Sequence, residues 1–364
     1  MARRLGAIAV LVVLVGLGIA LAERVRAPGP RRAGRSVGGA RSPAAAARAS
    51  TVNLAPGSDP SVLPGPVLIA DSDNNRLIEV SPAGHRLWEF PRPGDLAPGQ
   101  TFLKPDDAFF APTGRHVIAT QEEDFAISVI NLATDRIVYR YGHPGIPGFA
   151  ANHLDNPDDA LLTRSGQIVL ADIKNCRLLV IRPPAHQVVR QLGETGVCVH
   201  QPGVSYGSPN GWFPMHDGNS VVTEINGDWI DVLSPDGRVL SSTNAPGFSY
   251  PSDTNEVRPG VLLSADYTDP GAIETFTPSG HLLWRYAPSG PQALNHPSLA
   301  EPLPNGDILA NDDHNDRVIV IDPHTNRIVW QYGHTHIAGR QPGYLADPDG
   351  VDLAPPYSLL DRFK

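Results

Sequence analysis

The sequence reads VLIADSDNNRLIEV at residues 67–80. An apolar run, a polar turn of about five residues and a second run of alternating character form the pattern of a β-hairpin. Five later segments align with this one, at residues 116–130, 168–181, 220–233, 262–276 and 307–321. In each copy a carboxylate or amide ends the first strand, at Asp71, Gln121, Asp172, Glu224, Asp266 and Asp312. The repeat predicts a chain built from six like units.

Each unit contains two further predicted strands. Upstream of every hairpin except the first, a proline and a polar residue open an apolar stretch, at Pro105, Pro157, Pro209, Pro251 and Pro297. Downstream, a short turn leads to a strand with an aromatic residue, at Trp88, Tyr139, Trp284 and Trp330. The 37 prolines and 35 glycines of the 364-residue chain suit frequent turns. We therefore expect an all-β, six-bladed β-propeller with four-stranded blades.

The first copy lacks its innermost strand, and the missing strand is found at the other end of the chain. Residues 347–354 have the opening pattern of a repeat but no hairpin behind them. We expect this strand to join the first blade and close the ring, which leaves no exposed sheet edge. The predicted propeller spans residues 65–356, and residues 357–364 form a C-terminal tail.

The hairpins resemble those of the NHL-repeat family of six-bladed propellers. The resemblance rests on residues 69–77, 171–178 and 311–318, where an aspartate is followed five residues later by an arginine. Copies two, four and five have Ala126, Trp229 and Gly271 in place of the arginine. The endings Trp284-x-Tyr286 and Trp330-x-Tyr332 give a weaker similarity to quinoprotein-like and arylsulfotransferase-like propellers. The spacing from aspartate to arginine predicts structural ion pairs, either across the tight turn or to a neighbouring blade.

The N-terminal region predicts export from the cytoplasm. Arg3 and Arg4 precede an uncharged apolar run, Leu5 to Ala22, which we expect to be helical. Residues 1–26 fit either a cleaved signal peptide or a membrane anchor, since the run is long for the first and barely sufficient for the second. Residues 27–64 are rich in Pro, Gly, Ala, Ser and Arg, and we expect a disordered linker there. The protein would then be membrane-anchored or secreted.

Charge limits the partners of the predicted propeller. Residues 1–50 contain nine arginines and one acid, so the 29 basic and 38 acidic residues of the whole chain leave 20 and 37 for residues 51–364. Residues 51–364 thus have a formal charge near −17 and lack the clustered lysines and arginines that bind nucleic acid. We expect no nucleic-acid partner, and contact with a membrane only through the N-terminal segment.

A ring of oxygen ligands is expected where the innermost strands begin. In a four-stranded blade, the links between blades and the turns from second to third strand lie on one face, here called the top face. Asp107, Asp159 and Asp253 follow the proline–polar pair in three copies, and Asn210 and Asp349 lie one position earlier in theirs. Such carboxylates would repel one another at the channel mouth, and Ca²⁺ would relieve the repulsion. Calcium-dependent lactonases, to which the fold is similar, hold an ion in a comparable place. The alternative is that these residues cap turns.

Histidines are also frequent in the top-face segments. They are His143, His153, His200, His296, His314, His334 and His336. Neutral imidazole is a good ligand for Zn²⁺, although the spacing of these residues does not define a site. If the propeller is an enzyme, His153 or His296 is the expected general base.

The two cysteines, Cys176 and Cys198, both belong to the top face of the third copy. A disulfide between them suits an exported protein, and two free thiols are the alternative. Two hypotheses for function follow. The favoured one is a binding or scaffolding propeller that presents its top face to a protein, peptide or glycan. The other is a Ca²⁺- or Zn²⁺-dependent hydrolase, lactonase or lyase with its site at the channel mouth. Fold alone does not distinguish them.

Overall fold

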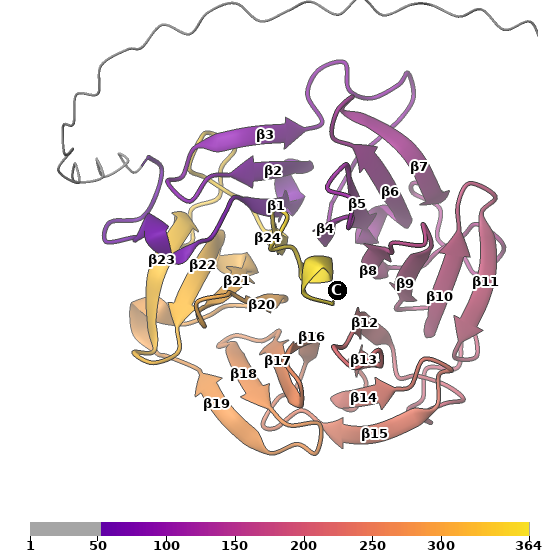
Figure 1. Cartoon of the computed structure of the whole chain (residues 1–364). Coiled ribbons are helices and arrows are strands. Elements are labelled where there is room, and N and C mark those ends of the chain that lie inside the picture. Colours follow the sequence, from indigo (N-terminus) through magenta and orange to yellow (C-terminus); the bar gives the residue numbers. More distant parts are fainter. Residues whose placement is uncertain (1–51, 364) are drawn as a thin grey trace, which may run out of the picture. The chain divides into compact units, whose positions relative to one another are not determined.

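The computed structural model describes residues 52–363, which fold into six four-stranded antiparallel sheets arranged around one axis (Figure 1). The prediction of an all-β, six-bladed propeller is confirmed. From the axis outward, blade one contains β24 (Pro348–Leu353), β1 (Val67–Asp71), β2 (Arg76–Val80) and β3 (Arg86–Phe90). Blade two contains β4 (Ala108–Phe110), β5 (His116–Gln121), β6 (Ala126–Asn131) and β7 (Arg136–Gly142).

The other four blades follow the same order. Blade three contains β8 (Pro157–Leu162), β9 (Ile168–Asp172), β10 (Arg177–Arg182) and β11 (Gln187–Leu192). Blade four contains β12 (Pro209–Pro214), β13 (Ser220–Glu224), β14 (Trp229–Leu233) and β15 (Val239–Asn244). Blade five contains β16 (Pro251–Arg258), β17 (Val261–Asp266), β18 (Ala272–Phe276) and β19 (Leu282–Tyr286). Blade six contains β20 (Ala300–Pro302), β21 (Ile308–Asp312), β22 (Arg317–Asp322) and β23 (Arg327–Gly333).

The described residues also contain six short 3₁₀ helices, four of them between strands and one at each end. They are η1 (Pro60–Val62), η2 (Ser72–Asn74), η3 (Glu122–Asp124), η4 (Gly290–Gln292), η5 (Asp313–Asn315) and η6 (Leu359–Phe363). Among the helices within residues 52–363, none has the length and apolar character needed to cross a membrane. The predicted N-terminal helix, and with it the signal peptide or anchor, lies outside this range.

The ring closes as the sequence predicts. β24 pairs antiparallel with β1, with Val67 opposite Leu353 and Ile69 opposite Val351. The last strand of the chain thus becomes the innermost strand of the first blade. All five residues of β1 are buried, because its two faces pack on neighbouring blades. This two-sided burial explains why the second strand of each repeat reads as an apolar run rather than as an alternating one.

The structure shortens the predicted linker. Residues 27–64 were expected to be disordered, but residues 54–63 follow the outer edge of β23. Leu54 forms an isolated bridge with Tyr332, and the amide of Asp59 donates to the carbonyl of Val329 at 2.8 Å. Leu63 is buried in the core. These backbone hydrogen bonds cover an edge strand, a role that the loop-like composition of the segment does not indicate.

The structure also corrects the C-terminal tail. Residues 357–364 were expected to lie outside the propeller, but η6 lies in the middle of the ring (Figure 1). Leu359 and Leu360 are part of the hydrophobic core. The amide of Leu359 donates to Oδ1 of Asp352 at 2.8 Å, and the amide of Phe110 donates to Oδ2 at 2.7 Å. Because the tail follows β24, it closes the channel at the bottom face, opposite the predicted carboxylate ring.

Candidate metal centre at the channel mouth

A buried aspartate–arginine pair on the top side of the sheet, here called the clamp, sets the start of the innermost strand in blades one, three and six. In blade three, Nε of Arg177 donates to Oδ2 of Asp172 at 2.7 Å, and both side chains are buried. Oδ1 of Asp172 accepts a hydrogen bond of 2.8 Å from the amide of Asp155, two residues before β8. The other nitrogens of Arg177 donate to the carbonyls of Phe149 and His153 in the same link. The clamp therefore holds the inter-blade link that leads into the innermost strand.

The same clamp recurs in blades one and six. Asp71 binds Arg76 at 2.6 Å, and Asp312 binds Arg317 at 2.6 Å. The free oxygen of each aspartate accepts from the backbone just before its own innermost strand, at Ala346 and Asn295. These are the ion pairs that the sequence indicates, and the structure adds their function, which is to fix where the innermost strands begin.

Irregular pairing at these starts turns two successive residues toward the channel. In a regular strand, neighbouring side chains point to opposite faces. Between Asp158 and Ala160 the register shifts, and Asp159 has a φ of 30°. Similar shifts occur at the starts of β12, β16 and β24. Bulges of this kind change the direction of side chains near functional sites. Here Asp158 and Asp159, although successive, both reach the channel mouth.

Three aspartates form an inner set at this mouth: Asp107, Asp159 and Asp253. They come from blades two, three and five, each exposes at most 2% of its surface, and one carboxylate oxygen from each lies within 4.8 Å of the others. Four of their six oxygens have no hydrogen-bond partner. Calcium binds oxygens at 2.3–2.6 Å, so ligand atoms across one ion are about 5 Å apart. The inner set therefore fits a single Ca²⁺.

Glycines make room for the inner set. Gly211 occupies the matching position in blade four, and a Cβ there would lie 2.7 Å from Oδ2 of Asp159 and 3.0 Å from Oδ1 of Asp253. Gly350 occupies it in blade one, and a Cβ there would lie 2.6 Å from Oδ1 of Asp107. Any larger residue at either position would displace the carboxylates.

The polar residues that follow the prolines form an outer set, one from each blade. The outer set is Asp106, Asp158, Asn210, Ser252, Ser298 and Asp349. These six side chains line a cavity of about 80 Å³, together with Glu122, Tyr250 and Tyr267. Within the set, Nδ2 of Asn210 donates to Oγ of Ser252, and Oγ of Ser298 donates to Oδ1 of Asp349. Asp106, Asp107 and Asp158 also place one oxygen each within 4.8 Å of one another, so carboxylates of both sets could bind one ion.

The carboxyl groups lie in an environment that disfavours their ionised form. Burial raises the pKa of Asp106, Asp107, Asp159 and Asp253 well above the usual range of aspartate, and repulsion from neighbouring carboxylates adds to this. Burial and the charge of Asp158 raise the pKa of Glu122 to about 7. Such a cluster must bind either protons or a cation, and a divalent cation would displace the protons.

All five residues that the sequence assigns to the metal meet at the mouth: the inner set, Asn210 and Asp349. Sequence reasoning does not assign Glu122, Tyr250 or Tyr267, which also line the cavity. Glu122 directly follows the residue that ends the second strand of blade two, as Asp313 does in blade six. Tyr267 has the same position after Asp266 in blade five, so this position is the signal that could have located Glu122 and Tyr267.

The two predicted general bases lie in different surroundings. The ring of His296 lies 4.1 Å from that of His314 and 4.8 Å from that of Tyr267, which lines the cavity. Burial lowers the pKa of His296, and the charge of His314 lowers it further. His153 instead packs against His143, with 4.4 Å between ring centroids, and is not among the residues of the cavity wall. Of the two, only His296 adjoins the candidate metal centre.

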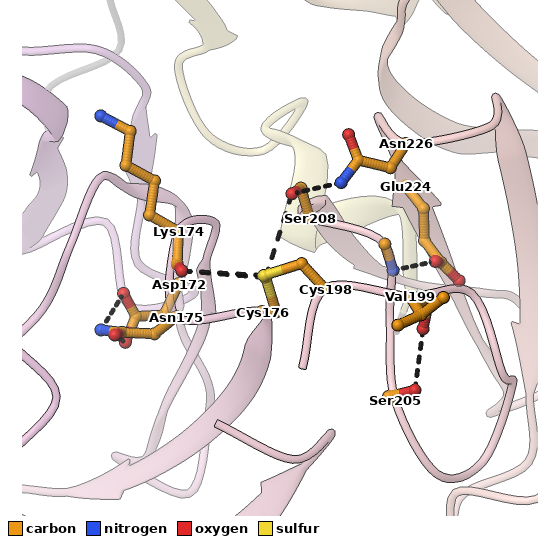
Figure 2. The surroundings of a disulfide bond; sticks show 11 residues. Asp172, Lys174, Asn175, Cys176, Cys198, Val199, Ser205, Ser208, Glu224 and Asn226 are labelled. Carbon is orange, nitrogen blue, oxygen red and sulfur yellow. Dashed lines mark hydrogen bonds between the residues drawn. A yellow bond between two sulfur atoms is a disulfide. The ribbon is translucent and has the colours of Figure 1, made fainter. Parts of the chain in front are cut away.

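The disulfide lies on the same face but apart from the cavity lining. Cys176 and Cys198 are bonded across a separation of 22 residues (Figure 2). Cys176 follows the turn that contains Asn175, whose side chain donates to both oxygens of Asp172. The bond thus ties the clamp of blade three to the link that leads into blade four.

Comparisons with known proteins agree on the fold. No protein-family model and no curated protein matches the chain. A protein of unknown function from Bacteroides caccae shares 16% identity with a TM-score of 0.54, over 79% of this chain and 98% of the other. A streptogramin B lyase shares 16% identity with a TM-score of 0.52, over 80% and 87%. Hydrazine synthase of Kuenenia stuttgartiensis shares 13% with a TM-score of 0.50, over 76% and 79%. At these identities the likeness shows a β-propeller fold and no more, so membership of the NHL-repeat family stays a prediction.

Proposed function

We propose that this protein is a calcium-dependent binding propeller whose ion lies at the channel mouth on the top face. The observation that supports this most directly is the inner set, in which three buried aspartates leave four oxygens without a partner. An isolated carboxylate loses several kcal/mol of hydration free energy when it is buried, and this loss needs compensation by a cation or protons. Calcium accepts carboxylate, amide and carbonyl oxygens in irregular geometry, as the two sets offer them.

The ion would also provide the means of binding a ligand. The outer set and the rings of Tyr250 and Tyr267 line the cavity above it. A glycan hydroxyl or a peptide carboxylate entering from the top face could complete the coordination, and the tyrosine rings offer a surface on which a sugar ring can pack. The 37 acids against 20 bases of residues 51–364 favour cation-mediated binding over direct binding of an anion.

Calcium titration calorimetry tests the proposal. The purified protein, stripped with chelator, is expected to bind one Ca²⁺ at this centre. Asp107→Asn and Asp159→Asn should abolish this binding, because each removes a ligand charge. Asp217→Asn is the matched control, since Asp217 is exposed on a bottom-face turn. A stripped protein that takes up no calcium, or variants that bind as the wild type does, would overturn the proposal.

A second function, a calcium-dependent hydrolase or lyase, is favoured by the group of Tyr267, His296 and His314 beside the centre. An imidazole with a lowered pKa is neutral at pH 7 and can accept a proton from a substrate held on the ion. Calcium-loaded protein would be tested against a panel of lactones and cyclic esters. Turnover that His296→Gln removes while calcium binding persists supports the enzyme, and absence of turnover across the panel supports the binding function.

We also propose that the protein acts outside the cytoplasm. The predicted apolar N-terminal run and the disulfide both suit an oxidising compartment. Titration of free thiols in protein isolated from its native host tests this. No reactive thiol is expected under denaturing conditions, whereas two titratable thiols would place the protein in a reducing compartment.

A further inference from the structure

Five of the six blades place an arginine in the clamp on the top side of the sheet. In blades one, three and six it comes from the third strand, as Arg76, Arg177 and Arg317. Blades two and five lack that arginine, and the fourth strand supplies one instead. Arg140 donates to Ser128, which donates to Gln121 in turn, and Arg285 forms an ion pair with Glu274. The clamp position thus contains a cation in all five.

Blade four departs from this pattern. Trp229 pairs opposite Glu224, where blades one, three and six have the arginine. Ser242 stands opposite Asp231, the place from which Arg140 and Arg285 act in their blades. Blade five has Glu274 at the matching position of its third strand, where Arg285 pairs with it. Blade four also has an acid there, Asp231, in place of the apolar residues Ile78, Leu179 and Ile319 of blades one, three and six. It therefore has two carboxylates in its clamp and no arginine from either strand.

The clamp of blade four contains a histidine from the preceding link. Nδ1 of His200 lies 2.9 Å from Oε1 of Glu224, and one ligand atom each of His200, Glu224 and Asp231 lies within 4.8 Å of the others. Glu224 and Asp231 are completely buried. Glu224 and Ser242 are neighbours of Asp231, but neither oxygen of Asp231 accepts a well-aligned hydrogen bond from them. A buried carboxylate oxygen of Asp231 thus lies within 4.8 Å of a nitrogen of His200 and an oxygen of Glu224.

We propose that His200, Glu224 and Asp231 bind a divalent transition metal, with Zn²⁺ the expected ion, in place of the arginine of the other clamps. One imidazole and two carboxylates form a donor set that suits Zn²⁺ better than Ca²⁺. In a tetrahedral zinc site the bonds of about 2.0–2.2 Å place neighbouring ligand atoms about 3.3 Å apart. The distances within the triad allow this with small side-chain movements.

The surroundings of the triad are those of a supported metal site. Oγ of Ser242 lies 3.2 Å from Nε2 of His200, so Nε2–H can donate to it and leave Nδ1 free for the metal. The ring of His200 stacks on Trp229, with 4.0 Å between centroids and 2° between planes. Oε2 of Glu224 accepts a hydrogen bond from the backbone amide of Gly207, in the segment after Cys198. Such second contacts orient ligands and commonly change metal affinity about 10–100-fold when removed.

The site is separate from the calcium centre proposed above, and the two share no residue. Glu224 and Asp231 belong to the second and third strands of blade four, whereas the inner and outer sets lie at the starts of the innermost strands. The zinc proposal can therefore fail or hold independently of the calcium proposal.

Zinc binding to the full chain tests the inference, with calcium present in excess so that the channel mouth is saturated. One tightly bound Zn²⁺ is expected by calorimetry and by elemental analysis after dialysis, and Co²⁺ should give the visible absorption of a tetrahedral site. Asp231→Asn and His200→Gln should lose this binding. Ser242→Ala should weaken it about 10–100-fold.

A double variant keeps the test informative if single variants unfold. Trp229→Arg with Asp231→Leu gives the third strand of blade four the pattern of blade three, where Arg177 stands opposite Asp172 and Leu179 follows two residues later. It should fold as stably as the wild type without zinc and bind no zinc. Asp107→Asn should bind zinc normally and lose only calcium. Wild-type protein that binds no zinc would overturn the proposal and would indicate a proton shared between Glu224 and Asp231. Zinc binding that survives the double variant would also overturn it, because the zinc would then lie elsewhere.

Discussion

At Gly211 the absence of a side chain leaves space for two carboxylates of the inner set. A methyl group there would lie 2.7 Å from Asp159 and 3.0 Å from Asp253, closer than carbon and oxygen tolerate. Gly211 does not have a positive φ, so alanine is compatible with its backbone. The residue is small because its neighbours are charged and close, and this makes it a sensitive probe of the proposed metal centre.

Gly211→Ala is expected to lower calcium affinity by about tenfold or more, or about 1.4 kcal/mol. The reason is that two ligands move without any loss of charge. Calorimetry measures the affinity, and circular dichroism reports whether the fold persists. Gly65→Ala is the matched control, since a Cβ there would make an ordinary contact of 3.8 Å with Tyr357. Equal calcium affinity in Gly211→Ala and wild type would contradict the assignment of the inner set.

Arg177 allows the contribution of one buried ion pair to the stability of the propeller to be measured. Arg177→Ala would leave Asp172 buried without its charge partner and would release the carbonyls of Phe149 and His153. Removing one partner of a buried pair costs about 3–5 kcal/mol. We expect that loss in the free energy of unfolding, measured by urea denaturation with calcium present. Arg182→Ala, an exposed change in the same strand, should stay within about 0.5 kcal/mol, and a similar loss in both variants would refute the clamp.

At the scale of elements, η6 brings charge into the bottom of the channel. Glu301 is completely buried, and neither of its oxygens has a hydrogen-bond partner. Arg362 and Asp352 are the charged groups that act on it. Burial raises the pKa of Glu301 to about 7, and the positive charge of Arg362 opposes the increase. The tail therefore supplies the cation that this carboxylate needs when it ionises.

The raised pKa of Glu301 predicts a pH dependence of stability. A carboxyl whose pKa is higher in the folded protein than in the unfolded chain favours folding below about pH 4.5, and this contribution disappears as the pH rises to about 7. Glu301→Gln should therefore match the wild type near pH 4.5 and gain on the order of 2 kcal/mol near pH 8. Urea unfolding at both pH values, with calcium held constant, measures the difference. A gain of the same size at both pH values would mean that titration of Glu301 is not the cause.

At the scale of the whole molecule, the C-terminal residues do two separate things. β24 completes blade one and closes the ring, while η6 fills the bottom of the channel. Closure removes the edge of β1, and filling buries the side chains of Leu359 and Leu360. Two truncated chains can separate these contributions.

A chain ending at residue 356 should keep the ring but lose about 3–6 kcal/mol of stability, because two leucines no longer become buried. A chain ending at residue 346 should not form a monomeric propeller at all, since the β1 edge stays open and promotes aggregation. Thermal unfolding and size-exclusion chromatography distinguish the two. If the shorter chain is monomeric and unfolds cooperatively, ring closure by β24 is unnecessary for folding.

The propeller could be predicted from the sequence because repetition is a local property of the chain. The hairpin of residues 67–80 and its five copies determine the number of blades, and the unmatched opening at residues 347–354 determines how the ring closes. The clamp pairs were visible for the same reason, since Asp172 and Arg177 are five residues apart and face one another across one turn. The register of blade five could not be predicted in this way. Its turn is one residue longer and places Ala272, not Gly271, opposite Asp266.

Contacts between distant segments needed the tertiary structure. Asp107, Asp159 and Asp253 repeat in sequence, but only the bulges and the neighbouring glycines show that their oxygens meet within 4.8 Å. His200 contacts Glu224 from a link that has no repeated pattern. η6 packs into the core from a segment that follows the last repeat and matches none of its strands. A repeated sequence determines the strands and their order, because each hairpin forms from neighbouring residues. Only the closed ring brings buried charges together and decides which of them lack a partner.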